Sequence, residues 1–339
     1  MNQLSKTISE DKVLVRGARQ LLTLQGSEHP RRGGSLGELS IVADGAILIR
    51  GCAIIEVGTS RRVENLKDAR GAREIDATGR VVMPGFVDAC AQLVQVQPRL
   101  DAYESMLRGA AESQGAADGR PLRAASAHRL EGHVRKLASF VGIQCGQQPF
   151  GNRPLIEYLK QARKLGLAVE ILAGCERAAR LAVEAEAVSL HIGRVQPAEI
   201  KLLAESSTIA VLAPASLLYL EPRRFASARA LIDSRVAVAL ASGFAPDWGP
   251  TSNMQTVISL ACLEMHMTPA EAICAATINA ANAQGCANRL GLLGPRKQAD
   301  LVLLHIEDYR ELPYYFGTNH VHLVVKNGCT TYHEGRVRP

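Results

Sequence analysis

The chain has 339 residues, of which 47% are hydrophobic and 21% charged, and its formal net charge is +6. That apolar content is sufficient for one large folded domain together with a small one. The positive charge comes from arginine and lysine pairs spread along the chain, without a basic stretch interleaved with aromatic residues, which argues against a nucleic-acid-binding protein.

The cysteines and the N-terminal sequence bear on the cellular compartment. No two cysteines have the Cys-x-x-Cys or zinc-ribbon spacing, and a chain of this length does not need disulfide staples, so we expect reduced thiols. The first ten residues contain no continuous apolar region, and no stretch approaches the roughly eighteen apolar residues of a membrane-spanning helix. We therefore expect a soluble, cytoplasmic protein that has no membrane partner.

Both ends of the chain contain short apolar runs separated by turns, a pattern that predicts antiparallel strands. The runs are residues 13–15, 46–49, 53–57, 300–304 and 321–325. Two terminal strand groups of this kind can combine into one β-domain, a small β-sandwich that we assign to residues 1–80 and 286–339.

The middle of the chain alternates predicted strands with predicted helices, which is typical of a parallel sheet with right-handed crossovers. The predicted strands are residues 82–88, 141–146, 167–172, 187–192, 208–213 and 236–242. A closed eight-unit barrel typically takes about 250 residues, and residues 81–285 leave room for fewer units. The sequence thus predicts an α/β fold with a TIM-like (β/α) barrel over residues 81–285 that lacks two strand–helix units.

Residues 84–88, Pro-Gly-Phe-Val-Asp, end the apolar run that predicts the first barrel strand. This segment resembles the opening of the metal-dependent amidohydrolases, and of the imidazolonepropionases most closely. Residues 297–302 carry the same family resemblance, and residues 309–314 resemble the imidazolonepropionase branch specifically. The resemblance implies a barrel that hydrolyses a cyclic C–N amide bond in histidine degradation with one zinc or iron ion.

The metal ligands of that family are not kept in this sequence. In the family, two histidines follow the opening motif, a third ends a later strand, and an aspartate ends the last barrel strand. The residues at these four places are Cys90, Gln92, Leu172 and Gly243. A catalytic metal needs at least three N, O or S donors, and leucine and glycine supply none. We therefore expect no metal cofactor and a pseudoenzyme that retains the scaffold for ligand binding or subunit association.

Two other positions match functional residues of the family. His191 falls at the strand histidine beside the metal, and Arg99 falls at an arginine that holds the substrate carboxylate, a task that suits a planar guanidinium. A single histidine after an apolar strand is more often a core or rim residue, and an arginine in a loop is more often solvated. If Arg99 keeps the family role, the ligand is a small anion.

A rebuilt site is the alternative to a pseudoenzyme. Cys90 is predicted at the C-terminal mouth of the barrel, where such folds build their active sites. Together with His191 it would form the nucleophile and base of an active non-peptide C–N hydrolase. A small buried cysteine that only fills space is the more common case.

Three further features remain open at the level of the sequence. His320 and His322 have the two-apart spacing of a metal site, but no third ligand is evident, so an exposed strand face is the preferred interpretation. Asp88 is expected to brace its strand end.

A shortened barrel is six-stranded, open, or closed by another subunit or a second copy of the chain. A sharp thermal unfolding transition would exclude the further possibility that the chain folds poorly.

Overall fold

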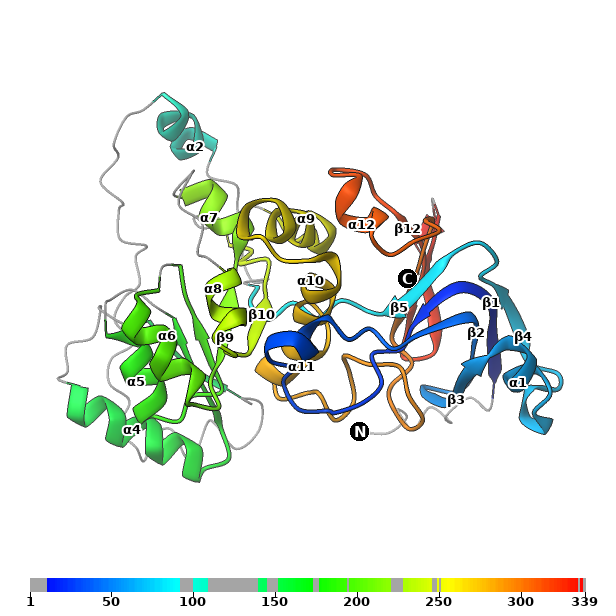
Figure 1. Ribbon diagram of the computed structural model, residues 1–339, viewed down its shortest axis with the longest axis horizontal. Helices are drawn as coiled ribbons and strands as arrows, with labels where there is room; N and C mark the ends of the chain where they lie inside the picture. Colours follow the sequence, from blue (N-terminus) through cyan, green and yellow to red (C-terminus); the bar gives the residue numbers. More distant parts are fainter. Residues whose placement is uncertain are drawn as a thin grey trace, which may run out of the picture.

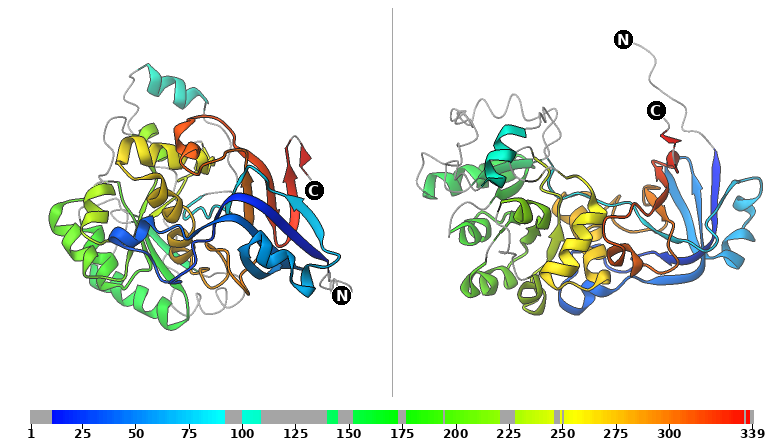
Figure 2. Two further views of the ribbon diagram at one scale, coloured as in Figure 1. Left: turned by 45° about the vertical axis from the view of Figure 1, so that its right-hand side comes forward. Right: turned by 90° about the horizontal axis from the view of Figure 1, so that it is seen from above.

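The computed structural model describes residues 11–91, 100–108, 140–144, 152–172, 177–193, 195–220, 228–245, 249, 251–334 and 336–337. Within these ranges the strands form two sheets, one built from both ends of the chain and one from its middle (Figure 1). In Figure 2 the two sheets lie at opposite ends of the molecule, with α9 (Met254–Met265), α10 (Pro269–Ala275) and α11 (Ile278–Ala283) between them. No helix in the residues that the structure describes is long and apolar enough to span a membrane.

The sheet from the two chain ends has nine strands in the described residues. In sheet order they are β14 (Arg336–Val337), β13 (Cys329–His333), β12 (Val321–Lys326), β11 (Leu301–Leu304), β5 (Val81–Pro84), β1 (Lys12–Leu22), β2 (Ile41–Arg50) and β3 (Ala53–Thr59), while β4 (Arg73–Asp76) pairs with β1 off this path. The five apolar runs at the two ends of the sequence all become strands of this sheet, so the prediction that these runs form strands is confirmed.

Strand β5 corrects the prediction that residues 82–88 form one barrel strand. Val81 to Pro84 pair parallel with β1 and antiparallel with β11, so they belong to the nine-stranded sheet. All four residues are buried, and a run that is apolar on both faces satisfies the centre of either sheet equally well. The strand ends at Pro84-Gly85, where the amide of Gly85 donates to Asp300 O at 3.0 Å.

The middle sheet is parallel throughout, and its five described strands confirm five of the predicted strands. In sheet order they are β10 (Val238–Leu240), β9 (Ile209–Leu212), β8 (Ser189–His191), β7 (Ala168–Leu172) and β6 (Phe140–Gln144). Ala91 makes one parallel bridge to Phe244, just after β10. Within the described residues, the first barrel strand is thus limited to this bridge, and hydrogen bonding does not close the barrel.

Helices follow the strands of the middle sheet and cover it. They are α4 (Asn152–Lys164), α5 (Ala178–Glu184), α6 (Pro197–Ala204), α7 (Pro214–Leu220) and α8 (Ala228–Asp233); shorter or outlying helices are α1 (Ser60–Glu64), α2 (Leu100–Leu107) and α12 (Glu311–Tyr314), with 3-10 turns at Gly33–Gly37 and Lys67–Ala69. Helix α6 begins at Pro197, whose missing N–H costs least at the first helical position. Its Glu199 carboxylate accepts from the backbone of Gln196 and so closes a capping box.

A buried asparagine ties the N-terminal loop to the barrel. The side chain of Asn279, at the start of α11, is fully buried. It accepts from Arg31 N at 2.7 Å and donates to Arg31 O at 2.9 Å and Val238 O at 2.8 Å. One side chain therefore joins the loop before the first 3-10 turn to the beginning of β10.

Candidate functional site

Strands β7 and β8 bring Glu170 and His191 to the same face of the parallel sheet. The register sets Leu172 opposite His191, and because residues two apart in a strand share a face, Glu170 lies on the face of Leu172. The alternate residues Val169 and Ile171 point into the hydrophobic core. The side chains of Glu170 and His191 are 16% and 12% exposed, respectively, so they are largely withdrawn from water.

Cys90 reaches the same place from the segment that follows β5. The amide of Gly243 donates to Cys90 O at 3.0 Å, next to the bridge between Ala91 and Phe244. Asp88 braces this junction, as expected from the sequence. Its Oδ1 accepts from Ser242 N at 2.9 Å and Cys90 N at 3.2 Å, and its Oδ2 accepts from the Ser242 hydroxyl.

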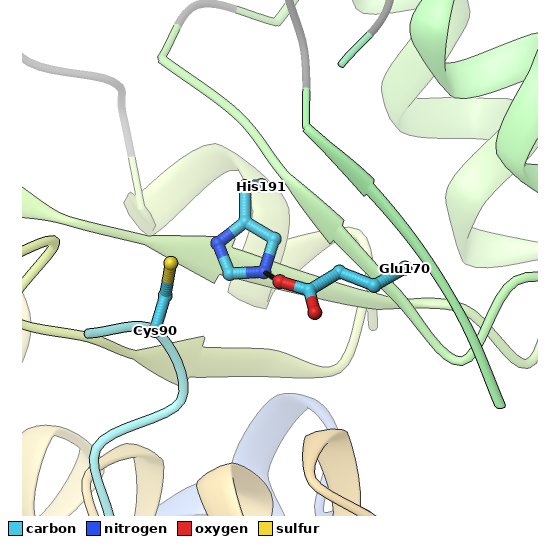
Figure 3. Close-up of side chains that lie close together, drawn as sticks. All are labelled: Cys90, Glu170 and His191. Carbon is cyan, nitrogen blue, oxygen red and sulfur yellow. Dashed lines mark ion pairs between the residues drawn. The ribbon is translucent and has the colours of Figure 1, made fainter. Parts of the chain in front are cut away.

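Cys90, Glu170 and His191 form a cluster in which one ligand atom of each side chain lies within 4.8 Å of the others. Figure 3 shows the imidazole between the other two groups, with Nε2 facing the Glu170 carboxylate and the opposite edge of the ring facing the Cys90 sulfur. His191 Nε2 and Glu170 Oε1 form an ion pair. The order thiol, imidazole, carboxylate is the order of nucleophile, base and orienting group in a catalytic triad.

The environment of His191 favours its charged form. Burial disfavours the imidazolium and acts to lower its pKa, but the interactions with Cys90 and Glu170 outweigh burial and raise the pKa of His191 to about 9. At neutral pH the ring is therefore protonated between a carboxylate and a thiol. An imidazolium beside a thiol is the environment in which cysteines become nucleophilic.

The raised pKa predicts that stability depends on pH. A group whose pKa rises on folding, here from the ordinary 6.5 to about 9, stabilises the fold below pH 6.5 and loses that effect as the pH rises through 9. We expect the free energy of unfolding to fall by on the order of 2 kcal/mol between these limits. In His191→Gln this decrease of the unfolding free energy with pH should disappear, as measured by urea unfolding at several pH values. Equal slopes in both proteins would contradict the buried ion pair.

The sequence is similar to known proteins over nearly its whole length. Residues 157–331 match the model of the amidohydrolase family. The imidazolonepropionase of Solibacter usitatus is 30% identical over 407 residues, which covers 93% of this chain and 97% of the relative. That of Geobacillus kaustophilus is 30% identical over 420 residues, with 96% and 99% covered. The chain is an imidazolonepropionase-like member of the amidohydrolase family. Both aligned spans exceed the 339 residues of this chain, so the relatives contain residues that it lacks.

Solved structures support the same fold. A triazine hydrolase variant superposes with a TM-score of 0.72 at 16% identity, covering 97% of this chain and 96% of that one. An adenosine deaminase from Xanthomonas campestris with bound zinc superposes with a TM-score of 0.65 at 17% identity, covering 98% and 95%. The predicted TIM-barrel-like α/β fold and the predicted family are therefore confirmed.

The four positions at which the resemblance places the family's metal ligands do not form a metal centre in the described residues of this imidazolonepropionase-like protein. Gln92, like the candidate Arg99, lies outside them. Leu172 offers no donor. Gly243 has φ +63°, and a Cβ on it would lie 2.1 Å from Ser216 Oγ. A carboxylate at this position would need the Ser216 hydroxyl to turn away and Ala213, whose Cβ would lie 2.9 Å from the new Cβ, to move.

Cys90, Glu170 and His191 are also a set of three possible zinc ligands. A zinc ion needs its ligand atoms around one point, at about 2.0–2.3 Å from each. Here the imidazole itself fills the space between the sulfur and the carboxylate (Figure 3). The three donor atoms would therefore have to rearrange before one ion could contact all of them.

Sequence reasoning proposed Cys90 and His191 but missed Glu170. The sequence did indicate the position of Glu170. It lies two residues before Leu172 in a predicted strand, so the two side chains had to lie on the same face. Its meeting with His191 depends on the register between β7 and β8, which the sequence alone does not set.

Proposed function

We propose that this imidazolonepropionase-like protein has lost the metal-dependent hydrolysis of its family and keeps the barrel mouth to bind a small ligand or to associate with another subunit. The observation that carries the proposal is Gly243. Its positive φ disfavours any side chain there, and a Cβ would lie 2.1 Å from Ser216 Oγ and 2.9 Å from Ala213 Cβ, so an aspartate ligand would require these neighbours to move. Leu172 adds an apolar group where the family has a histidine.

The test is a turnover assay on the untagged full chain, expressed with zinc, iron, manganese or nickel in the medium. We expect no hydrolysis of imidazolone propionate above the uncatalysed rate with any of these metals. Elemental analysis of Cys90→Ser and Glu170→Gln should show the same metal content as the wild type. Chelator-sensitive turnover, or metal that is lost on changing either residue, would overturn the proposal.

A second candidate is a C–N hydrolase without a metal, and the meeting of Cys90, His191 and Glu170 favours it. The Cys90 thiolate would attack the carbonyl carbon of a cyclic amide, and the C–N bond would break as the His191 imidazolium gives its proton to the leaving nitrogen. Water would then hydrolyse the thioester, with His191 accepting its proton and returning the thiolate. Glu170 would hold the ring in place. If the candidate Arg99 takes part, the substrate is an anion.

Selective alkylation distinguishes this candidate from a cysteine that only packs. We expect iodoacetamide to modify Cys90 at least about tenfold more slowly in His191→Gln than in the wild type, because the imidazole beside the sulfur is gone. Cys52, which is exposed, serves as the internal reference in peptide mass spectrometry and should react at an unchanged rate. Equal rates of Cys90 alkylation in the wild type and in His191→Gln would exclude the metal-free hydrolase.

A further inference from the structure

A second group of side chains with metal-binding chemistry lies on the nine-stranded sheet, outside the barrel. His305 directly follows β11, His322 lies on β12, and Glu334 directly follows β13. These three strands are neighbours in the sheet. One ligand atom from each side chain lies within 4.8 Å of the other two. Residues from distant parts of the sequence thus converge on one point of the sheet.

The contacts within this group are specific. His322 Nδ1 lies 3.0 Å from a carboxylate oxygen of Glu334, and the His305 and His322 rings meet edge to face with centroids 5.6 Å apart. The backbone holds them in register, since His305 N donates to His320 O at 2.7 Å and Glu334 N to His322 O at 2.9 Å. A third imidazole, His333, meets His322 edge to face with centroids 5.1 Å apart.

The two-apart spacing of His320 and His322 is not what forms this group. His320 is 6% exposed, and its ring packs near Tyr315 at a centroid distance of 6.2 Å. The partners of His322 come from the neighbouring strands instead. The sequence showed no third ligand because His305 and Glu334 are separated from His322 along the chain and meet it only through strand pairing.

We propose that His305, His322 and Glu334 form a binding site for a divalent transition-metal ion of the zinc type. Two imidazole nitrogens and a carboxylate suit zinc, cobalt or nickel, whereas magnesium and calcium prefer all-oxygen sites. Ligand atoms about 2.0 Å from a tetrahedral ion lie roughly 3.3 Å from each other, and the contact between His322 and Glu334 is already close to this spacing. His305 is exposed, so its ring is free to turn toward the ion. Water or His333 completes the coordination.

The surroundings of the proposed site influence its affinity for the metal ion and the effect of binding on stability. The positive charge of Arg80 acts on His322 and opposes a cation, so we expect affinity in the micromolar range. A bound ion would connect the segment after β11 with β12 and the end of β13. Because binding to the folded state alone stabilises it, the ion would raise the melting temperature of the protein.

The test uses zinc chloride as the probe and the untagged full chain, so that no tag histidines compete. We expect saturable binding of one zinc ion in calorimetry and a rise in melting temperature. Glu334→Gln should weaken binding at least about tenfold, because even outer-shell partners of metal ligands are worth about 10–100-fold. Glu334 is 63% exposed, so this change should leave the metal-free melting temperature unaltered. His322→Ala should remove the binding.

Matched controls decide whether the zinc is at this site. His29→Ala changes an exposed histidine in a distant loop and should bind zinc like the wild type, and magnesium should not replace zinc. The proposal is overturned if the wild type binds no zinc below millimolar concentration, or if Glu334→Gln and His322→Ala bind like the wild type. Loss of binding in Cys90→Ser would assign the ion to the barrel and contradict both this site and the proposed function.

Discussion

Replacing Gly243 with aspartate is expected to destabilise the protein by about 3 kcal/mol or more and not to create a metal ligand. A non-glycine residue at φ +63° is strained by roughly 1–2 kcal/mol. The new Cβ would also lie 2.1 Å from Ser216 Oγ and 2.9 Å from Ala213 Cβ, and such overpacking costs a further ~1–3 kcal/mol. Urea unfolding of the purified variant, with and without added zinc, measures both effects.

Two further variants separate the causes of that loss. Gly243→Ala carries the backbone strain with the smallest side chain and should be less destabilised than the aspartate variant. Combining Gly243→Asp with Ser216→Gly removes the obstructing hydroxyl and should recover part of the stability, while the contact with Ala213 Cβ remains. A Gly243→Asp protein as stable as the wild type that gains a bound zinc ion would contradict this account of the site.

Replacing Asn279 with leucine is expected to cost about 3 kcal/mol or more of unfolding free energy. The side chain is fully buried and makes three hydrogen bonds to the backbone of Arg31 and Val238. Leucine makes none of them, and each buried group left without a partner costs about 1–3 kcal/mol. Because Val238 begins β10, the N-terminal loop and the last barrel strand should loosen together. Hydrogen exchange of the amides in β10 would report this.

Asn282 provides a matched control on the same helix. Its side chain donates to Glu28 O and Ile278 O, both at 2.9 Å, but its bond to Glu28 is exposed to water. We therefore expect Asn282→Ala to cost about 1 kcal/mol or less. If Asn279→Leu is no more destabilising than Asn282→Ala, the interpretation that Asn279 anchors the N-terminal loop to the barrel is wrong.

The strands of the middle sheet could be placed from the sequence because their apolar runs are short and each is followed by a helical stretch. The prediction for residues 236–242, for example, contains β10 at Val238–Leu240. The prediction for residues 82–88 failed in its first half. Val81 to Met83 are apolar on both faces, and the choice of sheet depends on β1 and β11, which lie far away in the sequence. Local pattern carries no information about that choice.

The candidate site was partly predictable for a similar reason. Cys90 and His191 stand at recognisable places in a familiar pattern, whereas Glu170 enters through the register of two strands. The sequence showed a glycine at 243, where the resemblance predicts an aspartate. That Ser216 now occupies the space beside it depends on how α7 packs, and only the three-dimensional arrangement shows it.

The central position of β5 has a consequence for how the chain acquires its structure. This strand pairs Val82 with Leu21 on one side and with Leu303 on the other, so its second edge stays unpaired until β11 has been synthesised. Such high contact order slows folding and leaves an edge that other chains can join. The segment carrying Asp88 and Cys90 leads directly out of this strand. During translation, the barrel mouth thus becomes organised only after the C-terminal strands arrive.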